Sequence, residues 1–340
     1  MEKPYITVVA TTRNDNHGGD LLKRTAAFLH STYYQATKWN VAVEMIIVEW
    51  NPPADKPLLH TVLPKPPQGC PVSLKYVVVP ESLHKQYKSS PRIPLYQMIA
   101  KNVGIRRASA EFILCTNVDI LFSDELFKFL KTAPLKEGFF YRANRCDVPR
   151  ETLNYAEPDL QLKYSANHII KRLGKTKGHE LLRLPEWAYG YHNTVYLLNA
   201  ITLFIWKLLK PGQYRHLTLD FMACGDFTLM SKKDWYEIEG YAELDMYSIH
   251  IDSMALWSAA AVGKTQEILP GKVCVYHVYH DDGWESDDVV KTIRFLENKP
   301  CLDYSVVYKA GMQAIEKKQP IKLNKPDWGF VNHQFEEFTF

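Results

Sequence analysis

The chain has 340 residues, of which 46% are hydrophobic and 23% are charged, as in ordinary globular proteins. Its net charge of +3 is too small to indicate nucleic acid as a partner, and we expect none. The six cysteines lie far apart without a CxxC pair, which argues against a zinc cluster and favours a reducing compartment. Neither a signal peptide pattern nor an apolar stretch of about 18 residues occurs, so we expect a cytoplasmic protein without a spanning helix.

Apolar runs alternate with helical patterns along the first third of the chain. Buried strands are predicted at 5–10, 43–49, 73–79 and 112–115. Helical spacing follows the first run from Asp20 onwards, and LYQMIAKNVGIRRA (95–108) predicts another helix. The alternation predicts an α/β fold with a mainly parallel central sheet, in which ligands bind beyond the carboxyl ends of the strands.

The segment EFILCTNVDILFSDEL (111–126) is the strongest local signal. A buried run stops at the polar triplet Asn117-Val118-Asp119, and a helix is predicted to open at Ser123. An acidic turn at a strand end can hold Mg²⁺ or Mn²⁺, which take oxygen ligands and often share them with phosphate. A turn that only caps the helix is the alternative interpretation.

Residues 145–215 lack a clear strand-helix alternation and predict a helical insertion. Basic residues are concentrated between Lys163 and Arg183, and a strongly apolar helix is predicted at 195–210. Two interpretations remain open for 163–210. The helix is either a buried part of the insertion, or it lies beside the basic face at a membrane surface, which would make the protein peripheral to the cytoplasmic face of a membrane.

Regular structure is predicted again after the insertion. The runs FTLMSKK (227–233) and VCVYHVYH (273–280) predict strands, and 302–318 predicts a closing helix followed by an extended tail. The predicted organisation is a nucleotide-binding half at 1–144, the insertion at 145–215, an acceptor-binding half at 216–290, and a C-terminal helix and tail at 291–340.

Five segments in order resemble the glycosyltransferases of the GT-A fold, closest to the large inverting family 2. They are ITVVATTRND (6–15), IIVEWNPPAD (46–55), IAKNVGIRRASAEFILCTNVDILF (99–122), CGDFTLMSKKDWYEIEGYAE (224–243) and IDSMALWSAAAVG (251–263). The resemblance implies a single Rossmann-type α/β/α sandwich. It also implies a polysaccharide-building enzyme that transfers a sugar from a UDP- or GDP-linked donor to a hydroxyl of a glycan or lipid-linked glycan, with inversion.

The resemblance implies donor and metal contacts at the strand ends. Asn117 and Asp119 match the family's Asp-x-Asp triplet, so Asp119 is expected to bind Mn²⁺ or Mg²⁺ against the diphosphate. Asn117 replaces the first acid, and its uncharged amide oxygen either ligates the metal weakly or faces the ribose. Further donor contacts are expected at Thr11, Arg13, Glu49 and Arg92. For Glu49 the alternative is an exposed strand terminus.

The resemblance implies that Asp252 is the general base, which removes the proton of the acceptor hydroxyl. An Asp that only caps the following helix is the alternative, and Asp245 is a nearby competitor for the role. Asp226 and Trp284 are expected to contact the acceptor or the donor sugar.

A late histidine is a further metal ligand in this fold. His280 is the expected ligand and His277 the alternative, because positions i and i+3 of a strand face opposite ways.

Two other functions remain open. A catalytically inactive protein that binds a nucleotide sugar or glycan as an accessory would retain the fold, and the missing acid at Asn117 favours it. A nucleotidyltransferase has a related sheet, but it normally opens with a glycine-rich loop that grips a triphosphate. Here the glycines of TTRNDNHGG (11–19) come late, which disfavours that class.

Overall fold

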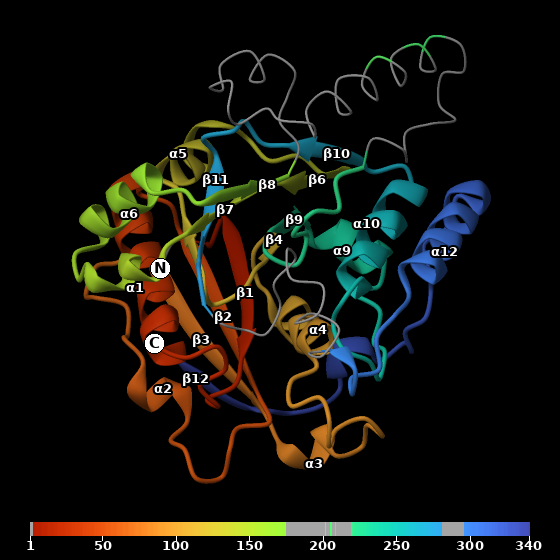
Figure 1. The fold of residues 1–340 in the computed structure, drawn as a ribbon, viewed down its shortest axis with the longest axis horizontal. Helices are drawn as coiled ribbons and strands as arrows, with labels where there is room; N and C mark the ends of the chain where they lie inside the picture. The colour runs from red at the N-terminus through yellow and green to blue at the C-terminus, as the bar shows by residue number, and fades with distance from the viewer. Residues whose placement is uncertain (1–2, 175–200, 202–204, 206–207, 209–218, 281–295) are drawn as a thin grey trace.

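The computed structural model describes residues 3–174, 201, 205, 208, 219–280 and 296–340. Its centre is an eight-stranded sheet with the order β10-β6-β9-β4-β1-β2-β3-β12 (Figure 1). The strands are β1 (Ile6–Thr12), β2 (Val43–Trp50), β3 (Val72–Val79), β4 (Phe112–Cys115), β6 (Phe139–Arg142), β9 (Thr228–Ser231), β10 (Thr265–Ile268) and β12 (Glu336–Thr339). The four strands predicted in the first third of the chain are β1 to β4.

The expectation of a mainly parallel sheet is wrong, because the sheet is mixed. β1, β2, β3 and β4 pair in parallel, as the strand-helix alternation predicts. β9, however, enters between β4 and β6 and is antiparallel to both, and β12 adds to the free edge of β3 in the antiparallel direction. These two strands arrive after long excursions of the chain rather than by a simple crossover helix, so the short-range pattern does not specify their direction.

A second, four-stranded sheet has the order β5-β11-β7-β8. Its strands are β5 (Ile120–Phe122), β7 (Asn144–Val148), β8 (Lys171–Leu173) and β11 (Cys274–Val278). One residue, Ala143, separates β6 of the large sheet from β7 of the small one, so the chain passes directly from one sheet to the other. The described part of the predicted insertion, 145–174, therefore contains strands as well as helix.

Helices cover both faces of the large sheet (Figure 1). On one side lie α1 (Leu21–Trp39), α5 (Asp124–Thr132) and α6 (Pro158–Asn167), and on the other lie α4 (Gln97–Arg107), α9 (Lys232–Glu237), α10 (Ile251–Ala261) and α12 (Tyr304–Lys317). Successive β1 residues point to opposite faces, so Val8 packs in the cluster of Phe28 and Val9 in that of Val103. Gly104 allows α4 to lie close to β1, because a Cβ at this position would collide with Val9.

Short helices connect these elements. They are α2 (Leu59–Val62), α3 (Glu81–His84), and the 3₁₀ turns η1 (Arg150–Asn154) and η4 (Trp328–Phe330). Ser123 caps α5 as predicted, since its hydroxyl accepts the N–H of Leu126. The alternative prediction, that Asp252 caps α10, is wrong, because His250 occupies the N-cap and Asp252 lies in the first turn.

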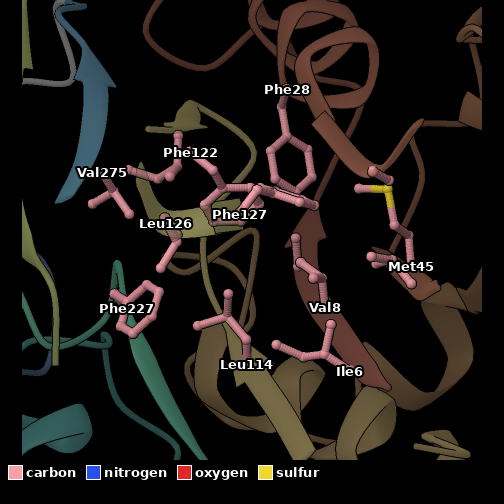
Figure 2. Packing of buried hydrophobic residues seen from close by; sticks show 14 of the residues in the cluster. Ile6, Val8, Phe28, Met45, Leu114, Phe122, Leu126, Phe127, Phe227 and Val275 are labelled. Carbon is pink, nitrogen blue, oxygen red and sulfur yellow. The ribbon is translucent and has the colours of Figure 1, made fainter. Parts of the chain in front are cut away.

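The apolar core reaches the junction of the two sheets (Figure 2). Phe122 of β5 lies between Phe28 of α1 and Phe127 of α5, with ring centroids 5.8 and 6.0 Å away. All three rings are almost completely buried. Truncating such a ring to alanine costs about 3–5 kcal/mol, so this cluster holds the small sheet against α1 and fixes the segment that precedes β5.

The closing helix and extended tail predicted from the sequence are α12 and β12. The predicted helix at 195–210 lies outside the described residues, apart from three isolated positions. Among the residues that the structure describes, no helix is both long and apolar enough to cross a membrane.

Candidate metal centre and adjoining cavity

Strand pairing brings polar residues of distant segments to one edge of the large sheet. β4 ends at Cys115, just before Asn117, and β9 begins at Thr228, just after Asp226. The antiparallel register pairs Cys115 with Thr228, so the end of one strand lies beside the start of the other. Asn117 and Asp226 are consequently in contact, with the amide Nδ2 donating to Oδ1 at 2.6 Å.

The small sheet places two histidines beside Asp119. The Asp119 backbone directly precedes β5, and the register of the small sheet pairs Ile120 with His277 of β11. The Val278 N–H donates to the Asp119 carbonyl at 3.0 Å, which ties the two segments together. β11 ends at Val278, so His280 lies in the loop that follows and turns back to the same carboxylate.

Asp119, His277 and His280 form a candidate metal-binding triad. The Nε2 atoms of His280 and His277 lie 2.9 and 3.8 Å from Oδ2 of Asp119, and one ligand atom from each residue lies within 4.8 Å of the others. The two histidines are therefore not alternatives, contrary to the expectation from strand alternation. That expectation treated both as strand residues, whereas His280 has left the strand.

The donor set fits a divalent cation. Oδ1 of Asp119 is buried and has no hydrogen-bond partner among the described residues. Nδ1 of His277 lies 3.1 Å from the Asp147 carboxylate, which accepts, so this nitrogen carries the proton and Nε2 keeps its lone pair. Two imidazoles and one carboxylate suit Mn²⁺ and later transition metals better than Mg²⁺, which prefers oxygen alone.

Cationic neighbours keep the carboxylate of Asp119 ionised. Its side chain is only 13% exposed, and burial disfavours the charge. The hydrogen bond from His280, the nearby His277 ring and the charge of Arg24 together outweigh burial and hold the pKa of Asp119 well below its usual range. Arg24 of α1 is buried, and its Nη1 lies 3.4 Å from Oδ2 of Asp119.

Arg24 also fixes the loop between β1 and α1. Its guanidinium donates to the carbonyls of His17 and Gly19. Gly18 has a φ of 68° and lies against the His280 ring, where a Cβ would collide with Nδ1. The late glycines of TTRNDNHGG thus serve close packing of this loop on the metal side of the site.

A cavity of about 320 Å³ adjoins the triad. All three triad residues line it, together with residues from the loop after β1 and from α4. Its charged lining comprises four basic residues, Arg13, Arg24, Arg145 and Lys299, and three acids, Asp15, Asp119 and Asp226. His17 lines the cavity as well. A divalent cation would raise this small positive excess by two charges, which favours a ligand with several negative charges.

Asn117 has its hydrogen-bonding capacity filled by protein atoms. Its Oδ1 accepts from Gln97 Nε2 at 2.7 Å and from Lys101 Nζ at 3.0 Å. The Lys101 side chain is completely buried, and burial lowers its pKa. An amide oxygen with two donors is poorly placed to ligate a metal, so Asn117 orients Asp226 instead. An aspartate here would put two carboxylates in direct contact.

Arg145 and Asp147 belong to the candidate site, and the sequence interpretation missed them. Arg145 of β7 donates through Nε to Asp147 at 2.6 Å and through Nη1 to Asp226 at 3.0 Å. Both face the site, while Cys146 and Val148 between and after them pack in an apolar cluster. This period-2 alternation in NRCDV (144–148) was the available signal for a half-buried strand.

The remaining predicted donor residues divide into two pairs. Thr11 and Arg13 line the cavity, and Arg13 is held by the Asn51 carbonyl and the Asp15 carboxylate at 2.7 and 3.0 Å. Arg92 is exposed and does not line the cavity. Glu49 is neither an exposed terminus nor a lining residue; it is completely buried and accepts the N–H of Leu59 at 2.8 Å.

Asp252 lies in the first turn of α10, beside Gly225. Its Oδ1 accepts the N–H of Ser253 at 2.9 Å, and its Oδ2 lies 3.1 Å from the position that a Cβ on Gly225 would occupy. It does not line the cavity. The competitor Asp245 instead caps a loop, accepting from the Ser89 N–H and the Tyr96 hydroxyl. Trp284 lies outside the described residues.

Comparison with models of known protein families gives no match. Comparison with curated proteins gives no match either. The functional argument therefore depends on the geometry of the site and on the sequence motifs.

Proposed function

We propose that the protein is a metal-dependent glycosyltransferase of the GT-A type, which transfers a sugar from a nucleotide-diphosphate donor to a hydroxyl of a glycan or lipid-linked glycan. The observation that carries the proposal is the triad of Asp119, His277 and His280 at the rim of a cavity with four basic residues. A nucleoside diphosphate brings several negative charges, and this lining with a divalent cation complements them.

The placement of the motifs supports the same function. The cavity is lined by residues that follow β1, by the segment that follows β4, and by the start of β9, which are three of the segments that resemble the family. In open α/β sheets, ligands bind beyond the carboxyl ends of the strands. Thr11 and Arg13 then border the nucleotide, and Asp226 and Arg145 border the sugar.

The proposed reaction is a single displacement with inversion. Asp252 takes the proton of the acceptor hydroxyl as its oxygen bonds to the anomeric carbon, and the bond from that carbon to the β-phosphate oxygen breaks. Gly225 leaves room for the Asp252 carboxylate, because a Cβ there would lie only 3.1 Å from Oδ2 of Asp252. A divalent cation on the triad would neutralise charge on the leaving diphosphate, and the donor set favours Mn²⁺ over Mg²⁺.

Thermal unfolding tests the proposal directly. The full chain is heated with Mn²⁺ and a panel of UDP- and GDP-sugars, since a specific ligand raises the melting temperature by mass action. We expect stabilisation by one nucleotide class only when Mn²⁺ is present, and release of free nucleoside diphosphate on addition of an acceptor. Failure of every nucleotide sugar to stabilise the Mn²⁺-treated protein would overturn the proposal.

A catalytically inactive nucleotide-sugar- or glycan-binding accessory protein is the second candidate. The position of Asp252 outside the cavity lining favours it, because no other carboxylate of the described lining is free for base catalysis: Asp119 belongs to the triad, Asp226 is held at both oxygens, and Asp15 pairs with Arg13. Metal-dependent donor binding without transfer to any acceptor, and without donor hydrolysis, would support this candidate.

A further inference from the structure

One chain of hydrogen bonds joins the two halves of the site. It runs from the Nδ1 atom of His277 to the Asp147 carboxylate at 3.1 Å, and from there to Nε of Arg145 at 2.6 Å. Nη1 of Arg145 continues it to Asp226 at 3.0 Å, and Asp226 ends on Asn117. Asp147 and Asp226 are 9% and 5% exposed, so water competes little for these bonds.

Asp147 holds the His277 ring in one tautomer and one orientation. Both residues lie on neighbouring parallel strands in direct register, which fixes their separation through the backbone. The carboxylate accepts from Nδ1–H, so Nε2 presents its lone pair towards Asp119. A histidine that binds a metal commonly needs such a partner on its other nitrogen.

Arg145 holds the Asp147 carboxylate in place. The same oxygen, Oδ1, accepts both from Nε of Arg145 and from His277. The guanidinium is itself anchored on Asp226, which fixes its position from the opposite side. Two carboxylates surround this cation, and burial opposes its charge less than they favour it, so the pKa of Arg145 is raised.

We infer that Asp147 is a positioning residue of the metal centre, which orients His277, and that Arg145 sets the place of Asp147 by bridging it to Asp226. The inference rests on the metal-binding part of the proposed function. It implies that metal affinity depends on a residue that never contacts the ion, and that the bridge couples the triad to Asn117 and Asp226.

Titration of the full chain with Mn²⁺, followed by calorimetry, tests the inference. We expect Asp147→Ala to weaken Mn²⁺ binding about 10- to 100-fold, as loss of such outer partners does elsewhere. Asp147→Asn keeps an oxygen acceptor and should recover part of the affinity. Asp159→Ala is the matched control, because Asp159 is a carboxylate of the same segment that lies outside the site, where it pairs with Lys163 and accepts from Tyr34. It should leave the affinity unchanged.

Co²⁺ provides a second readout that a purely structural role would not move. Its visible absorption bands report ligand geometry, so we expect altered bands in Asp147→Ala, intermediate bands in Asp147→Asn, and unaltered bands in Asp159→Ala. Removing Asp147 also leaves the Arg145 guanidinium with one fewer carboxylate, its bond to Asp226 remaining. The double variant Asp147→Leu/Arg145→Met removes both charges together and should lose Mn²⁺ affinity to a similar extent.

The outcomes separate the two claims. If the wild-type chain binds Mn²⁺ and both Asp147→Ala and the double variant bind it within twofold of wild type, the inference is overturned while the proposed function stands. If the wild-type chain binds neither Mn²⁺ nor Co²⁺, the metal centre itself is overturned, and the role of Asp147 with it.

Discussion

Two buried carboxylates near the carboxyl ends of β2 and β4 lie in opposite electrostatic environments. Asp119, after β4, accepts a hydrogen bond from His280 and lies beside His277 and Arg24, and these neighbours hold its pKa far below the usual range. Glu49, in β2, accepts one backbone N–H, and the structure describes no cation that pairs with it. Burial raises the pKa of Glu49 to about 7, which the hydrogen bond from Leu59 only partly opposes.

The difference shows that a strand-end acid is not a site by position alone. Glu49 lies near the end of buried β2, Asp119 follows buried β4, and both lie in segments that resemble a family motif. Only Asp119 has the partners that keep a carboxylate charged in a buried place, and only Asp119 lines the cavity. The convergence of two histidines and Arg24 therefore makes Asp119 the candidate site carboxylate, and four predictions test this contrast.

The largest effect is expected at Asp119. Asp119→Ala removes the central ligand of the triad, so we expect loss of Mn²⁺ binding and a fall in turnover of at least about 10³-fold, corresponding to several kcal/mol of lost charge stabilisation. EDTA treatment of the wild-type chain should have the same effect, reversed by Mn²⁺. The control Asp124→Asn changes a half-buried acid outside the cavity lining, which pairs with Lys38 and accepts from Trp39. Full activity in EDTA would contradict a metal role and shift attention to the arginines.

A smaller, purely catalytic effect is expected at Asp252. Asp252→Asn should lower turnover by about 10²–10⁴-fold, because the acceptor hydroxyl loses its base. Donor and Mn²⁺ binding should remain at wild-type levels, measured by calorimetry. This pattern distinguishes Asp252 from Asp119, whose loss affects binding as well. Near-normal turnover in the variant would remove Asp252 from the mechanism.

Glu49 should influence stability and its pH dependence rather than binding. The folded chain takes up a proton on Glu49 between pH 4.5 and 7 that the unfolded chain does not, so stability falls as the pH rises through this range. Glu49→Gln cannot ionise. Its free energy of unfolding should exceed that of wild type by under ~1 kcal/mol at pH 5 and by about 3 kcal/mol at pH 8.

Urea unfolding at several pH values measures the Glu49 effect, with the exposed Glu111→Gln as the control. If the free energies of unfolding of Glu49→Gln and wild type differ by the same amount from pH 5 to pH 8, the pKa of Glu49 is not raised by burial. Loss of donor binding in Glu49→Gln would show that it contacts the nucleotide after all.

The smallest effect is expected at Arg92. It is exposed and outside the cavity lining, so Arg92→Ala should change stability by no more than about 0.5 kcal/mol and leave donor binding unchanged. Arg13→Ala, which removes a lining cation, should weaken donor binding about tenfold or more, since hydrogen bonds to charged groups contribute about 1.5–3 kcal/mol. Equal losses of donor affinity in Arg92→Ala and Arg13→Ala would contradict the assignment of Arg13, and not Arg92, to the cavity lining.

Much of the fold follows from local pattern. The run at 112–115 is a strand with the predicted bounds, and Ser123 caps the predicted helix, because a buried run and a cap depend on neighbouring residues only. The predicted strand at 227–233 exists as β9, but its antiparallel direction was not predictable. Direction and order in a sheet depend on partners distant in sequence.

The candidate site shows the same division. Asp119 and His280 were expected as metal ligands, since a polar turn at a strand end and a late histidine are visible in the sequence. His277 joined them only because β11 ends before His280. Arg145 and Asp147 were missed, because they lie in a segment interpreted as a helical insertion and their roles depend on pairing with β11.

The sequence by itself determined where apolar runs stop and which polar side chains stand at their ends, because periodicity and turn chemistry act over a few residues. Only the tertiary structure decided which of those ends meet. The antiparallel β9 brings Asp226 to Asn117, the small sheet brings His277 to Asp119, and no cation reaches Glu49. Such contacts are set by packing of the whole chain, and they decide which buried acid stays charged.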